Sequence, residues 1–332
     1  MRIIKVLGIA AAVAAVAYLN NASFLAQPPA DRPTLLAHRG LAQTYDKAGL
    51  TPETCTATRI HSPSHDFLEN TIPSMRAAFE LGADVVELDV HPTTDGKFAV
   101  FHDWTLDCRT DGNGVTREHS LAELKALDIG YGYTADGGKT FPFRGKGVGL
   151  IPSLDEVLAA FPDKALLINV KSNDPEEGRL LAQRLAQLPS EQLDRLMAYG
   201  GDRPIAALHQ ELPALRVLSR STLKNCFIRY ALAGWMGYVP EACRRTLLLV
   251  PTNIGPWLWG WPHVFQRRLE QYGTRVYAVG PYDGADFSTG INTPEELERL
   301  PAGYAAGIWT DRIDVISRLL REQRDSGIAE GS

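Results

Sequence analysis

Eight short runs of aliphatic and β-branched residues recur along the chain, with helical stretches between them. Each run is apolar almost throughout, which is typical of parallel strands that are covered on both faces. Eight such units favour an α/β fold of the TIM (β/α)8 barrel type over an open doubly wound sheet. The predicted strands are residues 34–37, 85–90, 165–170, 196–199, 215–219, 246–250, 276–279 and 307–310.

A ninth strand-like run, residues 98–102, cannot be the next parallel strand. It follows residues 85–90 too closely, because a parallel crossover needs a dozen or more residues. The sequence TDGK at 94–97 is a turn signal, so we expect the run to be the second arm of a hairpin. Folding the chain about this turn places His102 roughly opposite Asp89.

Two helical stretches and one irregular segment complete the pattern. Residues 71–81 and 174–188 carry apolar side chains at helical spacing. Residues 109–149 are rich in glycine, aspartate and aromatic residues, so we expect them to form a capping insertion over the barrel mouth. The expected organisation is a signal peptide or transmembrane anchor at 1–20, a linker at 21–33, the barrel domain at 34–321 and a tail at 322–332.

The N-terminus carries a targeting pattern. Arg2 and Lys5 precede an almost uncharged, alanine-rich run at 6–19. Counted from Ile3, the apolar stretch is about 17 residues long, the lower length limit of a spanning helix. Small residues at 15–17 offer a cleavage site, so cleavage and anchoring both remain open. Since basic residues stay on the cytoplasmic side, the catalytic domain is expected to be membrane-anchored or exported, outside the cytoplasm.

Charge and cysteine content narrow the partners. A formal net charge of −5 without a clustered basic stripe argues against nucleic acid binding. The four cysteines, an even number, would form two disulfides in an oxidising compartment, and three pairings are open. No pair has the CxxC spacing of a zinc or thioredoxin-like site.

The tripeptide His38-Arg39-Gly40 directly follows the first predicted strand. In a TIM barrel the active site is assembled at the carboxyl ends of the strands. Histidine transfers protons near neutral pH, arginine binds phosphate through two N–H groups, and glycine lets the backbone approach a ligand closely. Taken alone, a histidine at a strand end more commonly makes a structural hydrogen bond, so the tripeptide gains weight only from its neighbours.

Glu87 and Asp89 supply that weight. Alternate residues of a strand point to the same face, so the two carboxylates converge, and convergent oxygen ligands favour a hard cation such as Mg²⁺ or Ca²⁺. The alternative is a pair of solvated charges at a strand end. Glu69 at the start of the first helix and the dipeptide His102-Asp103 at the end of the hairpin arm make that alternative weaker.

These motifs, taken in order, resemble the signature of the glycerophosphodiester phosphodiesterase family. The matching elements are HRG at 38–40, ENT at 69–71, ELDV at 87–90, DG at 95–96 and HD at 102–103. The stretch IPSLDEVL at 151–158 is similar to the family's next conserved stretch, and Thr310-Asp311 resembles its closing strand. The resemblance spans roughly residues 35–311 and is dense between 38 and 158.

The resemblance implies a TIM barrel that cleaves glycerophosphodiesters into an alcohol and glycerol phosphate. It implies that His38 and His102 are the acid/base pair and that Glu87 and Asp89 bind the divalent ion. The chemistry agrees, because phosphodiester cleavage needs charge stabilisation on the phosphate oxygens, a base for the nucleophile and an acid for the leaving alcohol.

The resemblance also implies that Arg39 and Lys171 hold the phosphate. Glu69 either completes the metal shell or orients Arg39. The chain departs from the family at Asn169-Val170-Lys171, where the family usually has Glu-x-Lys. An asparagine still offers a neutral oxygen to a hard cation, so Asn169 remains a candidate ligand, but the site loses one negative charge.

Three functional alternatives follow. The first is hydrolysis of small glycerophosphodiesters. The second is a lysophospholipase D acting on membrane lipids, which the N-terminal segment and the apolar stretch WLWGW at 257–261 would suit; that stretch is either packed core or a loop that touches the membrane. The third, a barrel that binds a ligand without turnover, is motivated by Asn169 and opposed by the retained histidines and carboxylates.

Overall fold

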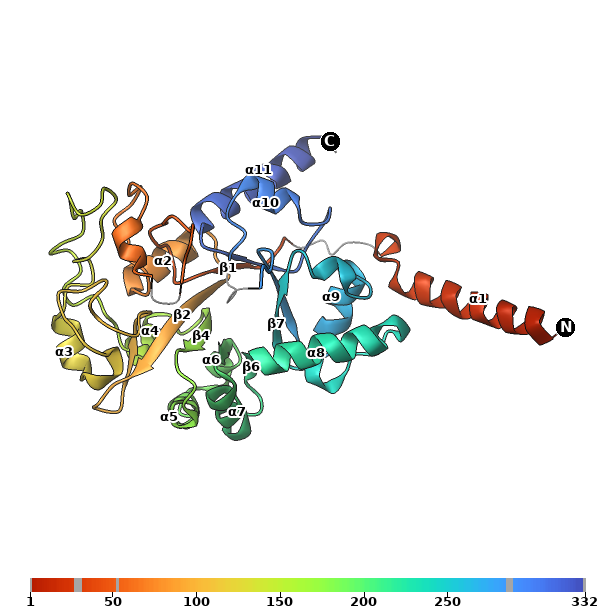
Figure 1. Cartoon of the computed structure of the whole chain (residues 1–332), viewed down its shortest axis with the longest axis horizontal. Helices are drawn as coiled ribbons and strands as arrows, with labels where there is room; N and C mark the ends of the chain where they lie inside the picture. Colours follow the sequence, from red (N-terminus) through yellow and green to blue (C-terminus); the bar gives the residue numbers. More distant parts are fainter. Residues whose placement is uncertain (1, 27–31, 52–53, 285–288, 331–332) are drawn as a thin grey trace.

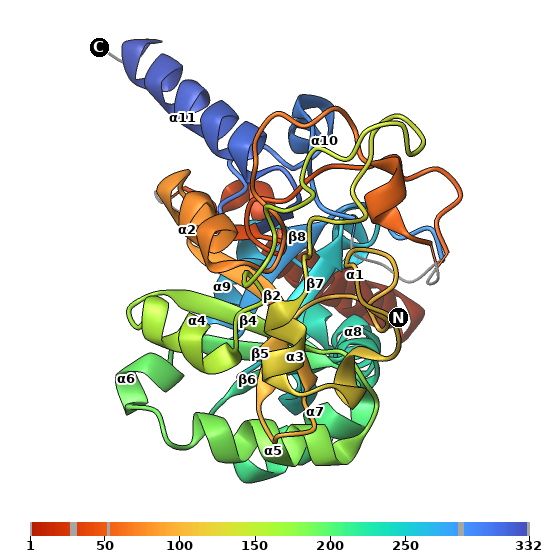
Figure 2. The ribbon, with the colours of Figure 1, turned by 90° about the vertical axis from the view of Figure 1, so that its left-hand side faces the viewer.

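In the computed structural model, eight parallel strands form a sheet that closes almost completely into a barrel, with helices around it (Figures 1 and 2). The structure describes residues 2–26, 32–51, 54–284 and 289–330. The strand order is β6-β5-β4-β2-β1-β9-β8-β7. The Thr246 hydroxyl, just before β7, donates to the Val217 carbonyl of β6 and links the two end strands.

The eight predicted parallel strands are all present, and the predicted barrel is confirmed. Nine of the sixteen strand ends agree with the prediction, and the other seven differ by one or two residues. The parallel strands are β1 (Leu35–Ala37), β2 (Val85–Pro92), β4 (Ala165–Val170), β5 (Leu196–Gly200), β6 (Arg216–Ser219), β7 (Leu247–Pro251), β8 (Arg275–Val279) and β9 (Gly307–Thr310).

The ninth run forms β3 (Phe98–Val100), which pairs antiparallel with β2. The predicted hairpin is therefore confirmed, although its second strand ends two residues early. Val90 lies opposite Val100, and the amide of Phe101 donates to the Asp89 carbonyl at 3.0 Å. His102 thus lies one residue beyond the position opposite Asp89, close to the predicted placement.

Helices cover the barrel, and several of them begin at side-chain caps. Thr71 caps α2 by accepting from the Ser74 amide, and Asp174 caps α5 by accepting from the Glu176 amide. The predicted stretches 71–81 and 174–188 therefore include residues that flank the helices. The helices of the barrel domain are α2 (Ile72–Glu80), α3 (Leu121–Ala126), α4 (Leu154–Ala160), α5 (Pro175–Leu185), α6 (Ser190–Leu193), α7 (Asp202–Glu211), α8 (Arg220–Ala233), α9 (His263–Glu270), α10 (Pro294–Glu298) and α11 (Ile313–Glu330).

The predicted capping insertion packs with the segment before α2 and with the end of the hairpin. Together they bury a second, smaller apolar cluster, separate from the barrel core, that includes Ile60, Leu106, Leu124 and Phe143. A disulfide between Cys55 and Cys108 joins the two parts of this cap. The other two cysteines form a second disulfide, Cys226–Cys243, so one of the three possible pairings is defined.

At the N-terminus, α1 (Arg2–Asn21) projects away from the barrel, at the end of the molecule opposite α3 (Figure 1). Its residues Ile4–Asn21 are long and apolar enough to cross a membrane and are not buried, a description that a signal sequence also meets. Of the predicted linker, residues 27–31 lie outside the described residues. In the predicted tail, residues 322–330 continue α11, and 331–332 are outside the description.

Residues 21–25 contact the barrel. Ser23 is 8% exposed; its hydroxyl donates to the Gly260 carbonyl and accepts from the amides of His263 and Val264 at the start of α9. Arg268 donates to the Asn21 side chain at 2.8 Å. The first part of the predicted linker is therefore fixed to the barrel.

Candidate active site

The backbone after β1 is tightly constrained. Gly40 has φ +81°, and a Cβ there would lie 2.3 Å from the Ser74 hydroxyl oxygen, so only glycine fits. Arg39 also has positive φ, at 58°, which is uncommon for a residue with a side chain and marks local strain. This turn directs His38 and Arg39 into the barrel mouth. Strained backbone of this kind is often found at functional sites.

His38 lies between two carboxylates. Its Nδ1 atom is 2.6 Å from an oxygen of Asp311, and its Nε2 atom is 3.7 Å from an oxygen of Glu87. The second oxygen of Asp311 accepts from Lys47 at 2.7 Å and from Asn292 at 2.9 Å. Burial raises the pKa of Asp311, but the hydrogen bond with His38 and the charge of Lys47 outweigh it and hold the pKa well below its usual range.

Glu87 and Asp89 are fully buried, side by side on β2. One oxygen of Glu87 accepts from the Tyr199 hydroxyl at 2.7 Å, and the other accepts from the Arg39 amide at 3.2 Å. Burial, and then the neighbouring charge of Asp89, raise the pKa of Glu87 to about 7. Glu87 is therefore a carboxylate without full compensation of its charge.

Asp89 has the opposite character, because cations and amides surround it. Asn70 and Asn169 each donate to one of its oxygens at 2.9 Å, and Arg39 Nε and Lys171 Nζ lie 3.2 and 3.5 Å away. Burial alone would raise its pKa. The charges of Lys171 and Arg39 outweigh this effect and lower the pKa well below the usual value, so Asp89 is ionised at neutral pH.

Glu69 contacts two arginines. One oxygen of Glu69 lies 2.9 Å from Arg39 Nη1, and the other lies 3.1 Å from Arg109 Nη1. Burial raises the pKa of Glu69, but the two guanidinium groups outweigh it and lower the pKa. Both oxygens thus contact guanidinium groups, an arrangement that supports the second of the two roles open for Glu69.

His102 has its own aspartate. Its Nδ1 atom is 2.6 Å from Asp103, whose other oxygen contacts Arg109 Nε at 2.9 Å. Burial, followed by the charges of Arg39 and Lys171, lowers the pKa of His102 to about 4. The ring is therefore neutral at pH 7. An anion paired with Arg39 and Lys171 would oppose this lowering.

A hollow of about 360 Å³ opens next to this cluster. Its lining includes His38, Arg39 and Glu69, residues 42–47, and Asn292, Thr293 and Glu296 at the start of α10. Glu87 and Asp89 do not line it. The hollow is large enough for a glycerophosphodiester head group, and Arg39 separates it from the buried carboxylates.

The oxygen atoms of Glu87, Asp89 and Asn169 suit a hard cation that binds with modest affinity. Within the described residues, no group of three His, Cys, Asp or Glu side chains is arranged to hold a metal ion. Glu87 and Asp89 lie two residues apart on the same face of β2, and Mg²⁺ commonly binds through one or two carboxylates, waters and substrate phosphate. Burial and the charge of Asp89 raise the pKa of Glu87, and a bound cation would oppose both effects. The Asn169 amide donates to Asp89 and would have to turn to offer its oxygen.

The eight residues singled out from the sequence lie in one network of contacts and charges. Sequence reasoning gave no role to Asp311, Asp103, Tyr199 or Arg109. The first two had a signal, since each closes a motif at a strand or hairpin end. Tyr199 had only its place at the end of a strand, and Arg109 had none, because its contacts arise from folding of the cap.

Residues 38–205 match the model of the glycerophosphoryl diester phosphodiesterase family. A glycerophosphodiester phosphodiesterase of Caldanaerobacter subterraneus is 43% identical over 103 residues, which cover 31% of this chain and 39% of that protein. The matches to the first curated relatives span about two fifths of those proteins' length.

Solved structures share the barrel over nearly their whole length. The glycerophosphoryl diester phosphodiesterase domain of a Mycobacterium tuberculosis protein has a TM-score of 0.61 at 18% identity, covering 87% of this chain and 99% of that domain. An Oleispira antarctica phosphodiesterase, solved in complex with the product sn-glycerol-3-phosphate, has a TM-score of 0.54 at 19% identity, covering 87% of this chain and 97% of that structure. At these identities the likeness establishes the fold.

Proposed function

The chain belongs to the glycerophosphoryl diester phosphodiesterase family, and from this we propose that it hydrolyses glycerophosphodiesters to an alcohol and glycerol phosphate. The observation that carries the proposal is the pair of histidines at the barrel mouth, each with its Nδ1 atom 2.6 Å from an aspartate, next to Arg39. The product bound by the Oleispira antarctica phosphodiesterase has the chemistry that this proposal requires.

In this reaction the oxygen of water forms a bond to phosphorus, and the bond between phosphorus and the alcohol oxygen breaks. One proton leaves the attacking water and one proton reaches the departing alcohol. His38 and His102 divide these two transfers. Because Asp311 and Asp103 occupy the Nδ1 atoms, each ring presents its Nε2 atom for the transfer.

Arg39 and Lys171 are the phosphate-binding residues. Both are cations close to Asp89, at 3.2 and 3.5 Å, and an incoming phosphate would compete with that carboxylate for them. Glu69 keeps the Arg39 guanidinium oriented through its contact at Nη1. Phosphate binding would also offset the positive charge of Arg39 and Lys171, which lowers the pKa of His102. Bound substrate would therefore raise the pKa of His102 toward 7.

Glu87 and Asp89 would hold a divalent ion, Mg²⁺ or Ca²⁺, with the Asn169 oxygen as a further ligand once its amide turns. When bound, such an ion supplies positive charge for the non-bridging oxygens of the phosphate. The Tyr199 hydroxyl keeps Glu87 in place by donating to it at 2.7 Å. With two carboxylates and one amide, we expect weaker binding than a site with three carboxylates would give.

The N-terminal helix α1 is the membrane anchor or export signal in this proposal, with the barrel outside the cytoplasm. The apolar stretch Ile4–Asn21 and the absence of burial along it support this role. Its test is extraction of membranes from cells that make the full chain. An anchored protein stays in the pellet after washing with high salt and carbonate, whereas release into the soluble fraction at full mass contradicts anchoring.

A lysophospholipase D activity is the second candidate, favoured by exposed aromatic residues. Trp257 is 84% exposed and Trp259 is 40% exposed, whereas Trp261 packs against Phe265 and Tyr304. The WLWGW stretch is thus neither wholly packed core nor wholly an exposed loop, the two alternatives for it in the sequence. Its exposed part would suit contact with lipid.

The test is an assay of the purified full chain against glycerophosphodiesters with different head groups and against lysophospholipids, with Mg²⁺, with Ca²⁺ and with chelator. We expect turnover of small glycerophosphodiesters that requires a divalent ion. Preference for lysophospholipids would favour the second candidate. Binding of glycerol phosphate without turnover of any substrate would leave a ligand-binding barrel.

A further inference from the structure

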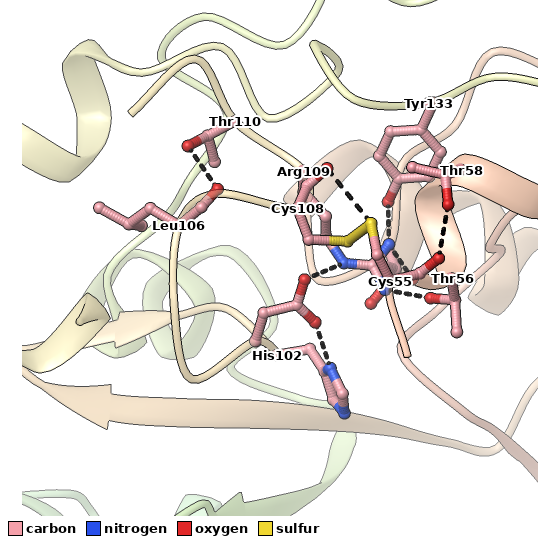
Figure 3. The surroundings of a disulfide bond; sticks show 11 residues. Cys55, Thr56, Thr58, His102, Leu106, Cys108, Arg109, Thr110 and Tyr133 are labelled. Atoms are coloured by element: carbon pink, nitrogen blue, oxygen red, sulfur yellow. Dashed lines mark hydrogen bonds and ion pairs between the residues drawn. A yellow bond between two sulfur atoms is a disulfide. The ribbon is translucent and has the colours of Figure 1, made fainter. Parts of the chain in front are cut away.

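Arg109 is a buried cation at the start of the capping insertion, with a side chain 3% exposed. Its guanidinium contacts two carboxylates, Asp103 at 2.9 Å and Glu69 at 3.1 Å. It also donates to the hydroxyls of Thr56 and Tyr133, each at 2.6 Å (Figure 3). The cation is therefore held at four points, which come from three separate segments of the chain.

The two carboxylates, Asp103 and Glu69, are also the partners of His102 and Arg39 in the candidate site. Asp103 accepts from His102 at Nδ1, and Glu69 accepts from Arg39 at Nη1. The Arg109 guanidinium consequently links the partner of His102 to the partner of Arg39. Arg109 lines no part of the hollow at the mouth and so does not meet substrate there.

The electrostatic effect of Arg109 runs in the same direction on both acids. Burial raises the pKa of Asp103 and of Glu69, yet the charge of Arg109 is the largest opposing effect on each, and both pKa values end below their usual range. Both acids therefore remain ionised acceptors. Burial tends to lower the pKa of Arg109 itself, but the two carboxylates outweigh it, so the guanidinium stays charged.

A disulfide holds the surroundings of Arg109 together. Cys108 precedes Arg109 in the chain, Cys55 precedes Thr56, and the Cα atoms of the two cysteines are 5.5 Å apart (Figure 3). The Arg109 carbonyl also accepts from the amide of Gly132, one residue before Tyr133. The bond thus keeps one hydroxyl partner of Arg109 beside the segment that carries Arg109.

We propose that Arg109 is a positioning residue for phosphodiester hydrolysis and that the Cys55–Cys108 disulfide keeps it in place, an inference that rests on the proposed function. Arg109 then affects turnover without lining the hollow itself. Loss of the hold on Arg109 releases Asp103 and Glu69 together, so His102 and Arg39 lose their orientation at the same time.

Replacing Arg109 would leave Asp103 with only the His102 ring and Glu69 with only Arg39, and the loss of this buried cation threatens the fold, so milder changes test the inference. Thr56→Val and Tyr133→Phe each remove one hydroxyl that Arg109 contacts and keep the packing. We expect each to lower kcat about threefold to tenfold, with KM within about twofold, and the double variant to lower kcat further. Thr58→Val, in the same turn, and Tyr131→Phe, in the same insertion, are the matched controls and should leave both constants within about twofold.

The disulfide is tested by a pair of double variants. Cys55→Ala/Cys108→Ala should lower kcat at a temperature where circular dichroism shows it folded, whereas Cys226→Ala/Cys243→Ala should not. A fall in kcat of the same size in both double variants would point to general destabilisation and would overturn the role given to the first bond.

A readout independent of turnover separates this inference from the proposed function. The ring Nδ1–H proton of His102, bonded to Asp103, should give a downfield NMR signal that disappears in His102→Gln. We expect it to shift or broaden in Thr56→Val and Tyr133→Phe and to be unchanged in the two controls. This pattern in a protein without turnover would support the positioning and reject the proposed function. An unchanged signal, or an equal change in the controls, would overturn the positioning even if the enzyme is active.

Discussion

The Nδ1 atom of His38 lies 2.6 Å from an oxygen of Asp311, although 273 residues separate the two in the sequence. The contact joins the ends of β1 and β9, which are neighbours in the barrel. A carboxylate at Nδ1 fixes the tautomer of the ring and leaves Nε2 for the chemistry. Lys47 and Asn292 hold the other oxygen, so the orientation of His38 depends on a network of side chains.

Asp311→Asn should therefore lower kcat about tenfold to a hundredfold, because the amide keeps the shape but no longer supports a proton at Nδ1 as the carboxylate does. Asp314→Asn is the control. Asp314 follows the same strand and pairs with Arg312, away from His38. The same loss of kcat in both variants would contradict a specific role for Asp311.

His38→Ala and His102→Ala should each lower turnover about a hundredfold or more and leave the fold intact, since general acids and bases contribute on that scale. Steady-state kinetics on protein with an unchanged circular dichroism spectrum is the measurement. His209→Ala is a suitable control, because His209 is exposed on α7 and does not line the hollow. Near-normal turnover in a folded His102→Ala variant would remove the hairpin from the mechanism.

The pKa of Glu87, raised from 4.5 to about 7, predicts a pH-dependent stability of the metal-free protein. The folded state holds this proton more tightly than the unfolded state, so the stabilisation is complete below pH 4.5. It is lost as the pH rises to 7 and is constant above that, at about 1.4 kcal/mol for each unit of pKa shift.

Glu87→Gln is neutral at every pH and lacks this loss. In chelator, its melting temperature relative to the wild type should be higher at pH 8 than at pH 5. Added Mg²⁺ or Ca²⁺ should stabilise the wild type more at pH 8, because the ion competes with the proton for Glu87. A difference in melting temperature that is the same at both values of pH would show that Glu87 is ionised in the folded protein throughout this range.

Asn169→Asp should tighten binding of the divalent ion, because affinity for hard cations rises with the charge of the ligands. In chelator the variant should be less stable than the wild type, since its new carboxylate replaces an amide that donates to Asp89 at 2.9 Å. Calorimetric titration with Mg²⁺ and Ca²⁺ measures the first effect and thermal unfolding the second. Unchanged affinity would mean that residue 169 does not reach the ion; tighter binding with lower turnover would mean that the amide also donates to the phosphate.

The positions of the strands could be predicted because each is an apolar run bounded by polar residues. Their ends could not, because pairing sets them. β2 extends to Pro92 since it pairs with Phe98 of the hairpin, which no apolar pattern indicates. The hairpin itself was predictable from the turn at 94–97 and from the short distance to the preceding strand.

The candidate site was predictable where its residues stand in motifs, as Glu87 and Asp89 do. The partners that tune it were not, because they depend on register and on the cap. Asp89 meets Asn169 because β2 and β4 pair with these two residues side by side. Arg109 reaches Asp103 and Glu69 only after the two parts of the cap have folded together. Four cysteines allow three pairings, and only the fold shows that Cys55 bonds to Cys108 and Cys226 to Cys243.

The most direct test of the central claim is ³¹P NMR of the product that the purified full chain forms from glycerophosphocholine in the presence of Mg²⁺ or Ca²⁺. We expect a phosphate monoester signal of glycerol phosphate, with choline released, and its loss in His38→Ala and His102→Ala. A phosphocholine signal would mean that the other ester bond is cleaved. Persistence of the starting diester with every divalent ion, or equal conversion by the wild type and both histidine variants, would contradict hydrolysis at this site.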